Sequence, residues 1–165
     1  MNKHLLPVLL LSALLTACAT TGTAQGSSGG ASGTSANDSN SALMQAVLMC
    51  DNNTIRLLIE KGADVNAADE NGDTALMSAA LTLCPSDTTR LLIEKGAQVN
   101  ASRKTGETAL MFAAMWGQSD TVRLLIASGA DLNAATTQGH TALDFAQAEG
   151  HTEIVKILRA AGAKK

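Results

Sequence analysis

Apolar and polar positions recur along most of the chain with a period of 33 or 34 residues. Leucine, for example, stands at Leu58 and again 34 residues later at Leu92. Four series keep this period: Leu58, Leu92, Leu125 and Leu158; Gly62-Ala63, Gly96-Ala97, Gly129-Ala130 and Gly162-Ala163; Thr74-Ala75-Leu76, Thr108-Ala109-Leu110 and Thr141-Ala142-Leu143; and Asn66, Asn100 and Asn133. Such extensive coincidence indicates internal repeats of one supersecondary unit.

Within each unit the pattern predicts two short antiparallel helices followed by a hairpin-like loop. Ser41, Thr74, Thr108 and Thr141 can each cap a first helix with a side-chain oxygen. The second helix carries an apolar stripe, as in 122–126, and ends at a glycine suited to a left-handed conformation. One unit cannot bury both of its faces, so stacked neighbours must supply the core. The sequence therefore predicts an all-α repeat solenoid.

The segments Asn-Gly-Asp-Thr-Ala-Leu-Met at 71–77 and Gly-His-Thr-Glu-Ile-Val at 150–155, with the Gly-Ala turns, resemble ankyrin repeats. The resemblance covers residues 41–165 and implies a stack of about four repeats, at 41–67, 68–101, 102–134 and 135–165. The chain departs from the family pattern in having Ala instead of Pro after the capping Thr, and Met77, Met111 and Asp144 instead of His. In the last repeat Gln147 and Arg159 replace apolar residues, as expected of a terminal unit.

The N-terminal segment differs in pattern from the repeats. Residues 1–17 have a charged start and an apolar middle that is too short to span a membrane, which predicts a signal peptide. Leu15-Thr16-Ala17-Cys18 resembles the lipobox of bacterial lipoproteins, which implies cleavage before Cys18 and its acylation with chains such as palmitate. The alternative is an ordinary cleaved signal with an incidental cysteine. Residues 18–40, rich in Gly, Ser, Thr and Ala, predict a flexible linker.

The lipobox resemblance also implies a location. Ala19 follows Cys18 at the position where an aspartate would signal retention in the inner membrane. The resemblance therefore implies a lipid anchor in the bacterial cell envelope, in the outer membrane and facing the periplasm.

Composition and charge narrow the possible functions. The 165 residues allow one domain, and 12 basic and 15 acidic residues without runs exclude the basic stripe that nucleic-acid binding needs. His140 and His151 are the histidines beyond the signal peptide, and neither has metal-ligand spacing. No nucleophile, phosphate-loop or paired-carboxylate motif is present. We therefore expect neither an enzyme nor a cofactor, with a thiol or hydrolytic enzyme as the alternative.

Cys50 and Cys84 lie 34 residues apart, in equivalent turns between the helices of the first two units. An oxidising compartment favours a disulfide. Equivalent residues of stacked units are expected ~8 to 10 Å apart, however, whereas a disulfide needs Cα atoms within about 7 Å. An extra residue and Pro85 could bend the second turn inward. Two buried free thiols are the alternative.

The family resemblance implies a concave side, made of loop tips and first helices, that holds another protein. Mapped by position, the candidates are Glu70, Asn71, Asp73, Arg103, Lys104, Glu107, Gln138 and His140 at the tips and Leu48, Met49, Leu81, Met115 and Trp116 at the helix ends. Trp116 is the strongest candidate, because Trp and Arg dominate interface hot spots. The alternative is that Trp116 packs against the turn near Cys84 and Pro85.

These features predict a monomeric, membrane-anchored scaffold that binds another protein by shape and charge complementarity. Small size, a lipid anchor and a binding fold suggest an immunity protein that occludes a toxin directed at the envelope. The alternative within the same class is a structural or stress-support protein that holds another periplasmic protein near the membrane.

Overall fold

A computed structural model describes residues 36–164, which form eight α-helices. The predicted signal peptide, Cys18 and the predicted linker up to residue 35 lie outside the described residues. Within the described part, no helix is long and apolar enough to cross a membrane.

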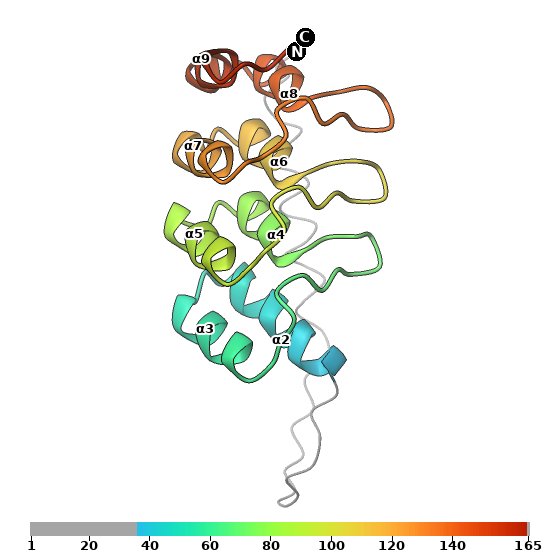
Figure 1. The fold of residues 1–165 in the computed structure, drawn as a ribbon, viewed down its shortest axis with the longest axis vertical. Coiled ribbons are helices and arrows are strands. Elements are labelled where there is room, and N and C mark those ends of the chain that lie inside the picture. Colours follow the sequence, from blue (N-terminus) through green and yellow to red (C-terminus); the bar gives the residue numbers. More distant parts are fainter. Residues whose placement is uncertain (1–35, 165) are drawn as a thin grey trace, which may run out of the picture. The chain divides into compact units, whose positions relative to one another are not determined.

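The helices form four pairs, which we call units 1 to 4. Their bounds are α2 (Ala36–Leu48) and α3 (Asn52–Glu60), α4 (Ala75–Leu81) and α5 (Ser86–Glu94), α6 (Ala109–Met115) and α7 (Ser119–Ala127), and α8 (Ala142–Ala148) and α9 (Thr152–Ala160). The first helices α2, α4, α6 and α8 stack in one layer and the second helices in another, with the loops between units projecting to one side (Figure 1). The predicted all-α solenoid is confirmed; the described loops contribute isolated bridges, Ala68 to Thr74 and Ser102 to Thr108.

Local signals define the helix ends as predicted. The hydroxyl oxygens of Thr74, Thr108 and Thr141 each accept a hydrogen bond, at 3.4 Å, from the backbone N–H three residues later. In unit 4 the Asp144 carboxylate also accepts from the Thr141 N–H at 2.9 Å, which completes a capping box. Each second helix is followed by a left-handed glycine, such as Gly62 with φ of 95°.

Unit 1 begins earlier than predicted. The predicted linker extends to residue 40 and Ser41 is its predicted helix cap, but α2 begins at Ala36 and Ser41 lies inside it. Residues 36–40, directly before Ser41, are themselves helical, so the chain does not turn at Ser41. The added part of α2 also contacts the loop after α3, because the Asn40 side chain accepts a hydrogen bond from the Asp64 N–H at 2.9 Å.

The core consists mainly of aliphatic side chains, with leucines at equivalent positions of the four units. Leu43, Leu76, Leu110 and Leu143 are all at most 2% exposed. Fully buried alanines in the first helices allow neighbouring helices to approach closely: they are Ala79, Ala80, Ala113, Ala114 and Ala146. This close packing explains how a chain with 2% aromatic residues builds a continuous core.

A series of asparagines joins consecutive units near the ends of the second helices. The Asn66 side chain donates to the Gly96 carbonyl at 3.0 Å and accepts from the Gln98 N–H at 2.7 Å. Asn100 makes the equivalent pair of bonds to unit 3, at 3.0 and 2.8 Å. Each side chain thus satisfies backbone groups at a helix end of the next unit.

A second series of contacts joins the units at the turns between paired helices. The Gln118 side-chain N–H donates to the Ala80 carbonyl of the preceding unit. His151 Nε2 lies 3.0 Å from the Met115 carbonyl oxygen of the preceding unit, within hydrogen-bonding distance. At the equivalent position unit 2 has Cys84, whose sulfur is bonded to Cys50 of unit 1. The disulfide therefore replaces the hydrogen bond that the later units use.

Candidate protein-binding site

The loop tips of units 2 to 4 are joined backbone to backbone. The Lys104 N–H donates to the Asn71 carbonyl at 3.2 Å, and the Thr137 N–H donates to the Thr105 carbonyl at 3.0 Å. Gly106 permits this approach, since a Cβ there would lie 2.9 Å from the Thr136 Cα. The three tips therefore form one surface. We call it the tip face, comprising residues 69–73, 103–107 and 136–140.

The predicted tip residues differ in accessibility. Five are exposed, whereas Asp73, Arg103 and Glu107 are partly buried. The exposed ones are Glu70, Asn71, Lys104, Gln138 and His140. The exposed side chains change from acidic at the unit 2 tip to basic at the unit 3 tip and to neutral polar groups at the unit 4 tip.

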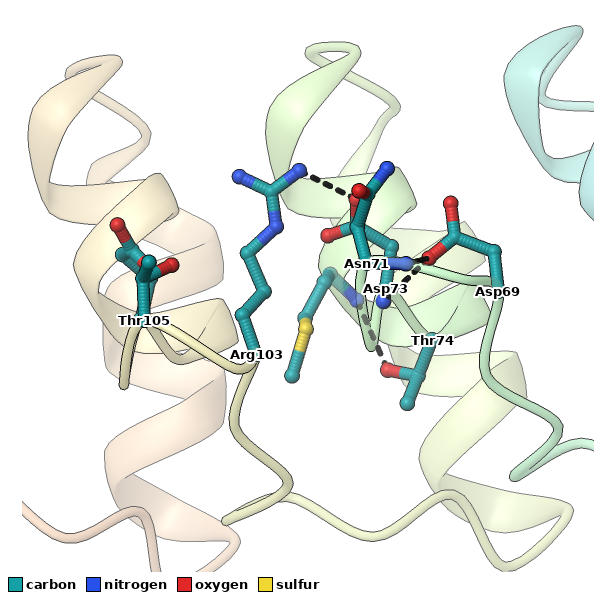
Figure 2. A network of polar contacts seen from close by, with 8 residues as sticks. Asp69, Asn71, Asp73, Thr74, Arg103 and Thr105 are labelled. Carbon is teal, nitrogen blue, oxygen red and sulfur yellow. Dashed lines mark hydrogen bonds and ion pairs between the residues drawn. The ribbon is translucent and has the colours of Figure 1, made fainter.

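Arg103 and Asp73, both predicted as partner contacts, bind one another. Figure 2 shows the Arg103 guanidinium extending from the unit 3 loop to the Asp73 carboxylate of unit 2. The guanidinium carbon also lies 5.3 Å from the centre of the Phe112 ring, within cation–π range. Their side chains are only 27% and 13% exposed. Arg103 and Asp73 thus hold two tips together and leave little of either side chain accessible to a partner.

Hydrogen bonds within the tips give the face a defined shape. One carboxylate oxygen of Asp69 accepts from the N–H groups of Asn71 and Asp73, each at 2.8 Å (Figure 2). At the next tip the Thr105 hydroxyl donates to the Glu107 carboxylate. A preformed loop loses less conformational entropy on binding, so this order favours recognition by the exposed side chains.

The unit 4 tip is ordered in a similar way by a buried threonine. The Thr136 hydroxyl oxygen accepts from the backbone N–H groups of Gln138 and His140, at 3.3 and 3.2 Å. The His140 ring centre lies 6.0 Å from that of Phe145, with the rings tilted. The His140 side chain is nonetheless exposed and can contact a partner.

The predicted residues at the first-helix ends differ in accessibility, and Leu48 and Met49 of unit 1 are exposed. Leu81, Met115 and Trp116 are partly buried and pack against the core. The Trp116 indole nitrogen is buried, without a hydrogen-bond partner in the described part of the chain. This arrangement favours a packing role for Trp116 over a partner contact.

Cys50 and Cys84 form a disulfide, with Cα atoms 5.5 Å apart, so the structure contains the bridge rather than two free thiols. Cys50 has φ of 54° and Leu83 has φ of 59°, in the left-handed region. The equivalent residues of units 3 and 4 are glycines, Gly117 and Gly150, with φ of 75° and 74°. The left-handed backbone at Cys50 and Leu83 was not predicted from the sequence. The signal for it was that Leu83 aligns with two glycines, Gly117 and Gly150.

The turn of unit 1 also carries a capped carboxylate. Asp51 accepts hydrogen bonds from the Thr54 hydroxyl at 2.6 Å and from the N–H groups of Thr54 and Asn53 at 3.2 and 3.1 Å. These bonds, above all the one from the Thr54 hydroxyl, lower the pKa of the Asp51 carboxyl below its ordinary value, although desolvation opposes them. Among the described residues, no group of three or more His, Cys, Asp or Glu is arranged to hold a metal ion.

Comparison with known families agrees with this architecture. The family model described as ankyrin repeats (3 copies) matches residues 24–103 and 84–165. A search of curated proteins found no significant match.

Proposed function

Because the chain belongs to the ankyrin-repeat family, we propose that it is a scaffold that binds another protein through the tip face. The observation that supports this most is the joining of three preformed tips into one surface with exposed side chains of different charge. Glu70 and Lys104 lie on consecutive tips. They can select a partner that presents a basic group to Glu70 and an acidic group to Lys104, and so fix the position of the partner along the stack.

A charge exchange on the tip face tests this proposal. The full chain, with Glu70→Lys and Lys104→Glu together, is used to capture partners from envelope extract beside the unchanged chain. Glu60→Lys with Lys61→Glu is the matched control, because it exchanges the same charges at the exposed end of α3. We expect one protein to be captured by the unchanged chain and the control and lost with the tip variant. Loss with both variants, or with neither, would contradict binding through the tips.

We further propose that Cys18 is acylated and anchors the scaffold to the bacterial envelope, in the outer membrane and facing the periplasm. The support is the sequence Leu15-Thr16-Ala17-Cys18 after an apolar segment, with Ala19 following. Cells fed a palmitate analogue should label the unchanged chain but not Cys18→Ser. Equal labelling of the two chains would contradict acylation at Cys18.

Within this function, immunity against a toxin directed at the envelope is our more specific proposal. It rests on the small size, the predicted anchor and the family's binding fold. Deletion of the gene should reduce survival only beside toxin-producing siblings, and survival should return with the unchanged gene but not with the tip-face variant. Equal survival of the deletion strain beside producers and non-producers would contradict it.

A further inference from the structure

The contacts between the tips follow one pattern, in which a backbone N–H of each tip donates to a carbonyl of the tip before it. Lys104 donates to Asn71, and Thr137, which aligns with Lys104, donates to Thr105. By the same alignment the donor of the unit 2 tip is the Glu70 N–H. Within the described part of the chain this N–H has no hydrogen-bond partner. The series of tips therefore ends in an unused backbone donor.

The place beside the unit 2 tip is open, because the corresponding part of unit 1 is helical. Residues 36–39, which align with 70–73, belong to α2 and form no tip. An open hollow of about 390 Å³ lies between α2 and the unit 2 loop. Its lining comes from both elements: Asn40, Ser41, Met44 and residues 67–70. A loop that enters this hollow lies beside the residue that carries the unused donor.

The contacts between tips also show what kind of segment fits this edge. Each acceptor carbonyl belongs to a polar residue followed by glycine, in Asn71-Gly72 and Thr105-Gly106. Both glycines have φ of 89°, and the next tip approaches so closely that a Cβ at Gly72 would lie 3.2 Å from the Arg103 Cα. A segment that joins the edge in the same way therefore needs glycine after its acceptor residue.

A second copy of the chain does not fit the edge in this geometry. Its unit 4 tip, at the end of the stack, contains Gln138-Gly139 and is followed directly by α8. Placing that tip before the unit 2 tip of another copy would bring α8 into the position of α2, which already packs against α4. The segment must come from a loop without a helix directly behind it, such as the loop of a β-hairpin.

We propose that the partner inserts a β-hairpin loop, with a polar residue followed by glycine, at the free edge of the unit 2 tip. A carbonyl of that loop accepts from the Glu70 N–H and continues the contacts between the tips. This inference rests on the proposed function and deepens it by naming the form of the partner. When a peptide adds to an exposed edge, hydrogen bonds between backbones supply affinity and side chains supply specificity.

Proline at position 70 separates the backbone donor from the side chain. The Gly72 N–H donates to the Asp69 carbonyl at 3.0 Å, so Glu70 is the first central residue of a β-turn, and its φ is not positive. Proline is favoured at this position of common β-turns, so Glu70→Pro should fold. Glu70→Ala is the matched control, because it removes the same side chain and keeps the N–H. Thermal unfolding and the amide NMR signals of Lys104 and Thr137 check that the tips of both variants stay joined.

The probe is a cyclic peptide with the sequence of residues 135–141, Ala-Thr-Thr-Gln-Gly-His-Thr, which carries the acceptor and the glycine of a tip without its helix. The matched probe has alanine in place of that glycine. Both peptides are titrated into the full chain, and binding is followed by the backbone amide NMR signals. We expect the glycine peptide to shift the Glu70 amide proton downfield, as formation of a hydrogen bond requires.

The glycine peptide should bind the unchanged chain and Glu70→Ala with affinities within about threefold of one another. It should bind Glu70→Pro at least tenfold more weakly, and the alanine peptide should bind the unchanged chain at least tenfold more weakly. The proposal is overturned if the glycine peptide does not bind at millimolar concentration, if it binds the proline and alanine variants equally, or if both peptides bind equally. It is also overturned if Glu70→Pro abolishes self-association in sedimentation, since the occupant is then a second copy.

Failure of this proposal differs from failure of the proposed function. If a protein is captured through the tip face but the glycine peptide does not bind, the free edge alone is contradicted. If the peptide binds as expected but no protein is captured, the edge is supported and the proposed function is contradicted. With a captured protein, Glu70→Pro should reduce capture more than Glu70→Ala, and equal capture by the two variants would overturn the role of the edge.

Discussion

Two buried threonines of α5 differ from the residues at the equivalent positions of the other units. Thr88 and Thr89 are completely buried, and their hydroxyls lack a hydrogen-bond partner within the described residues. The threonine equivalent to Thr88 in unit 3, Thr121, donates to Gln118 at 3.0 Å. Unit 2 has at that place the cysteine that forms the disulfide, which removes the acceptor. The disulfide at the turn therefore leaves the Thr88 hydroxyl, one helical turn away, without a hydrogen-bond partner in the described part of the chain.

Replacing Thr89 with valine should stabilise the chain by about 1 to 2 kcal/mol, because an unsatisfied buried hydroxyl is removed and the volume is kept. Ile55 and Val122 occupy the equivalent buried position in units 1 and 3. Urea unfolding measures the change. Thr74→Val is the control with the opposite sign, since it removes a helix cap and should cost about 1 kcal/mol. A destabilised Thr89→Val chain would contradict this account.

The capped carboxylate at residue 51 predicts a pH dependence. Because the pKa of Asp51 is lowered in the folded chain, its ionised form stabilises the fold above the unfolded pKa, near 3.9, and this contribution is lost as pH falls through the folded value. The unchanged chain should therefore be more stable than Asp51→Asn between pH 5 and pH 7, and the difference should close below about pH 4. Denaturant unfolding across this range measures it, and a difference independent of pH would refute the interpretation.

At the scale of elements, the asparagine between units is the contact that is repeated most regularly. Asn100→Ala removes two hydrogen bonds between units 2 and 3 and should lower the free energy of unfolding by about 1 to 2 kcal/mol. Asn133→Ala at the end of the stack, where the side chain accepts from the Lys164 N–H at 2.8 Å, should cost less. Equal losses for the two variants, measured in urea, would contradict the view that the two hydrogen bonds of Asn100 set the size of its contribution.

The helices could be predicted from sequence because the periodic leucines, capping threonines and terminal glycines are local signals. The start of α2 could not, since Asn40 bonds to a residue 24 positions later and breaks the repeat pattern. Capping oxygens at Thr74 and its equivalents were predicted from the residue alone. The first helix of unit 1 is thus longer than those of the other units, and Asn40 in its added part bonds to the loop after α3.

The candidate site was predictable only in part for a similar reason. Exposed tip residues such as Glu70 and Lys104 follow from their place in the loop. That Arg103 binds Asp73 and packs on Phe112 depends on side-chain conformations in two units, which the spacing of residues does not determine. The contact of Trp116 with the core depends likewise on the packing of neighbouring units.

At the scale of the whole molecule, the disulfide joins the terminal unit to the rest of the stack. A bridge across 34 residues restricts the unfolded chain by about 4 kcal/mol in the chain-entropy model. Cys50→Ser with Cys84→Ser should lower stability by up to that amount. Since units interact with their neighbours alone, amide hydrogen exchange should accelerate first in α2 and α3. Uniform acceleration through α9 would contradict the expectation that the bridge stabilises unit 1 most.

The central claim is that a partner protein binds the tip face. The most direct measurement is photo-crosslinking in cells with two full-length variants. One carries a photoreactive amino acid in place of Lys104 on the tips, and the other carries it in place of Arg123 on α7. Both positions are exposed. We predict one discrete heavier adduct from position 104, lost when Glu70→Lys is added, and none from position 123. An adduct from position 123 alone, or from neither position, would contradict the claim.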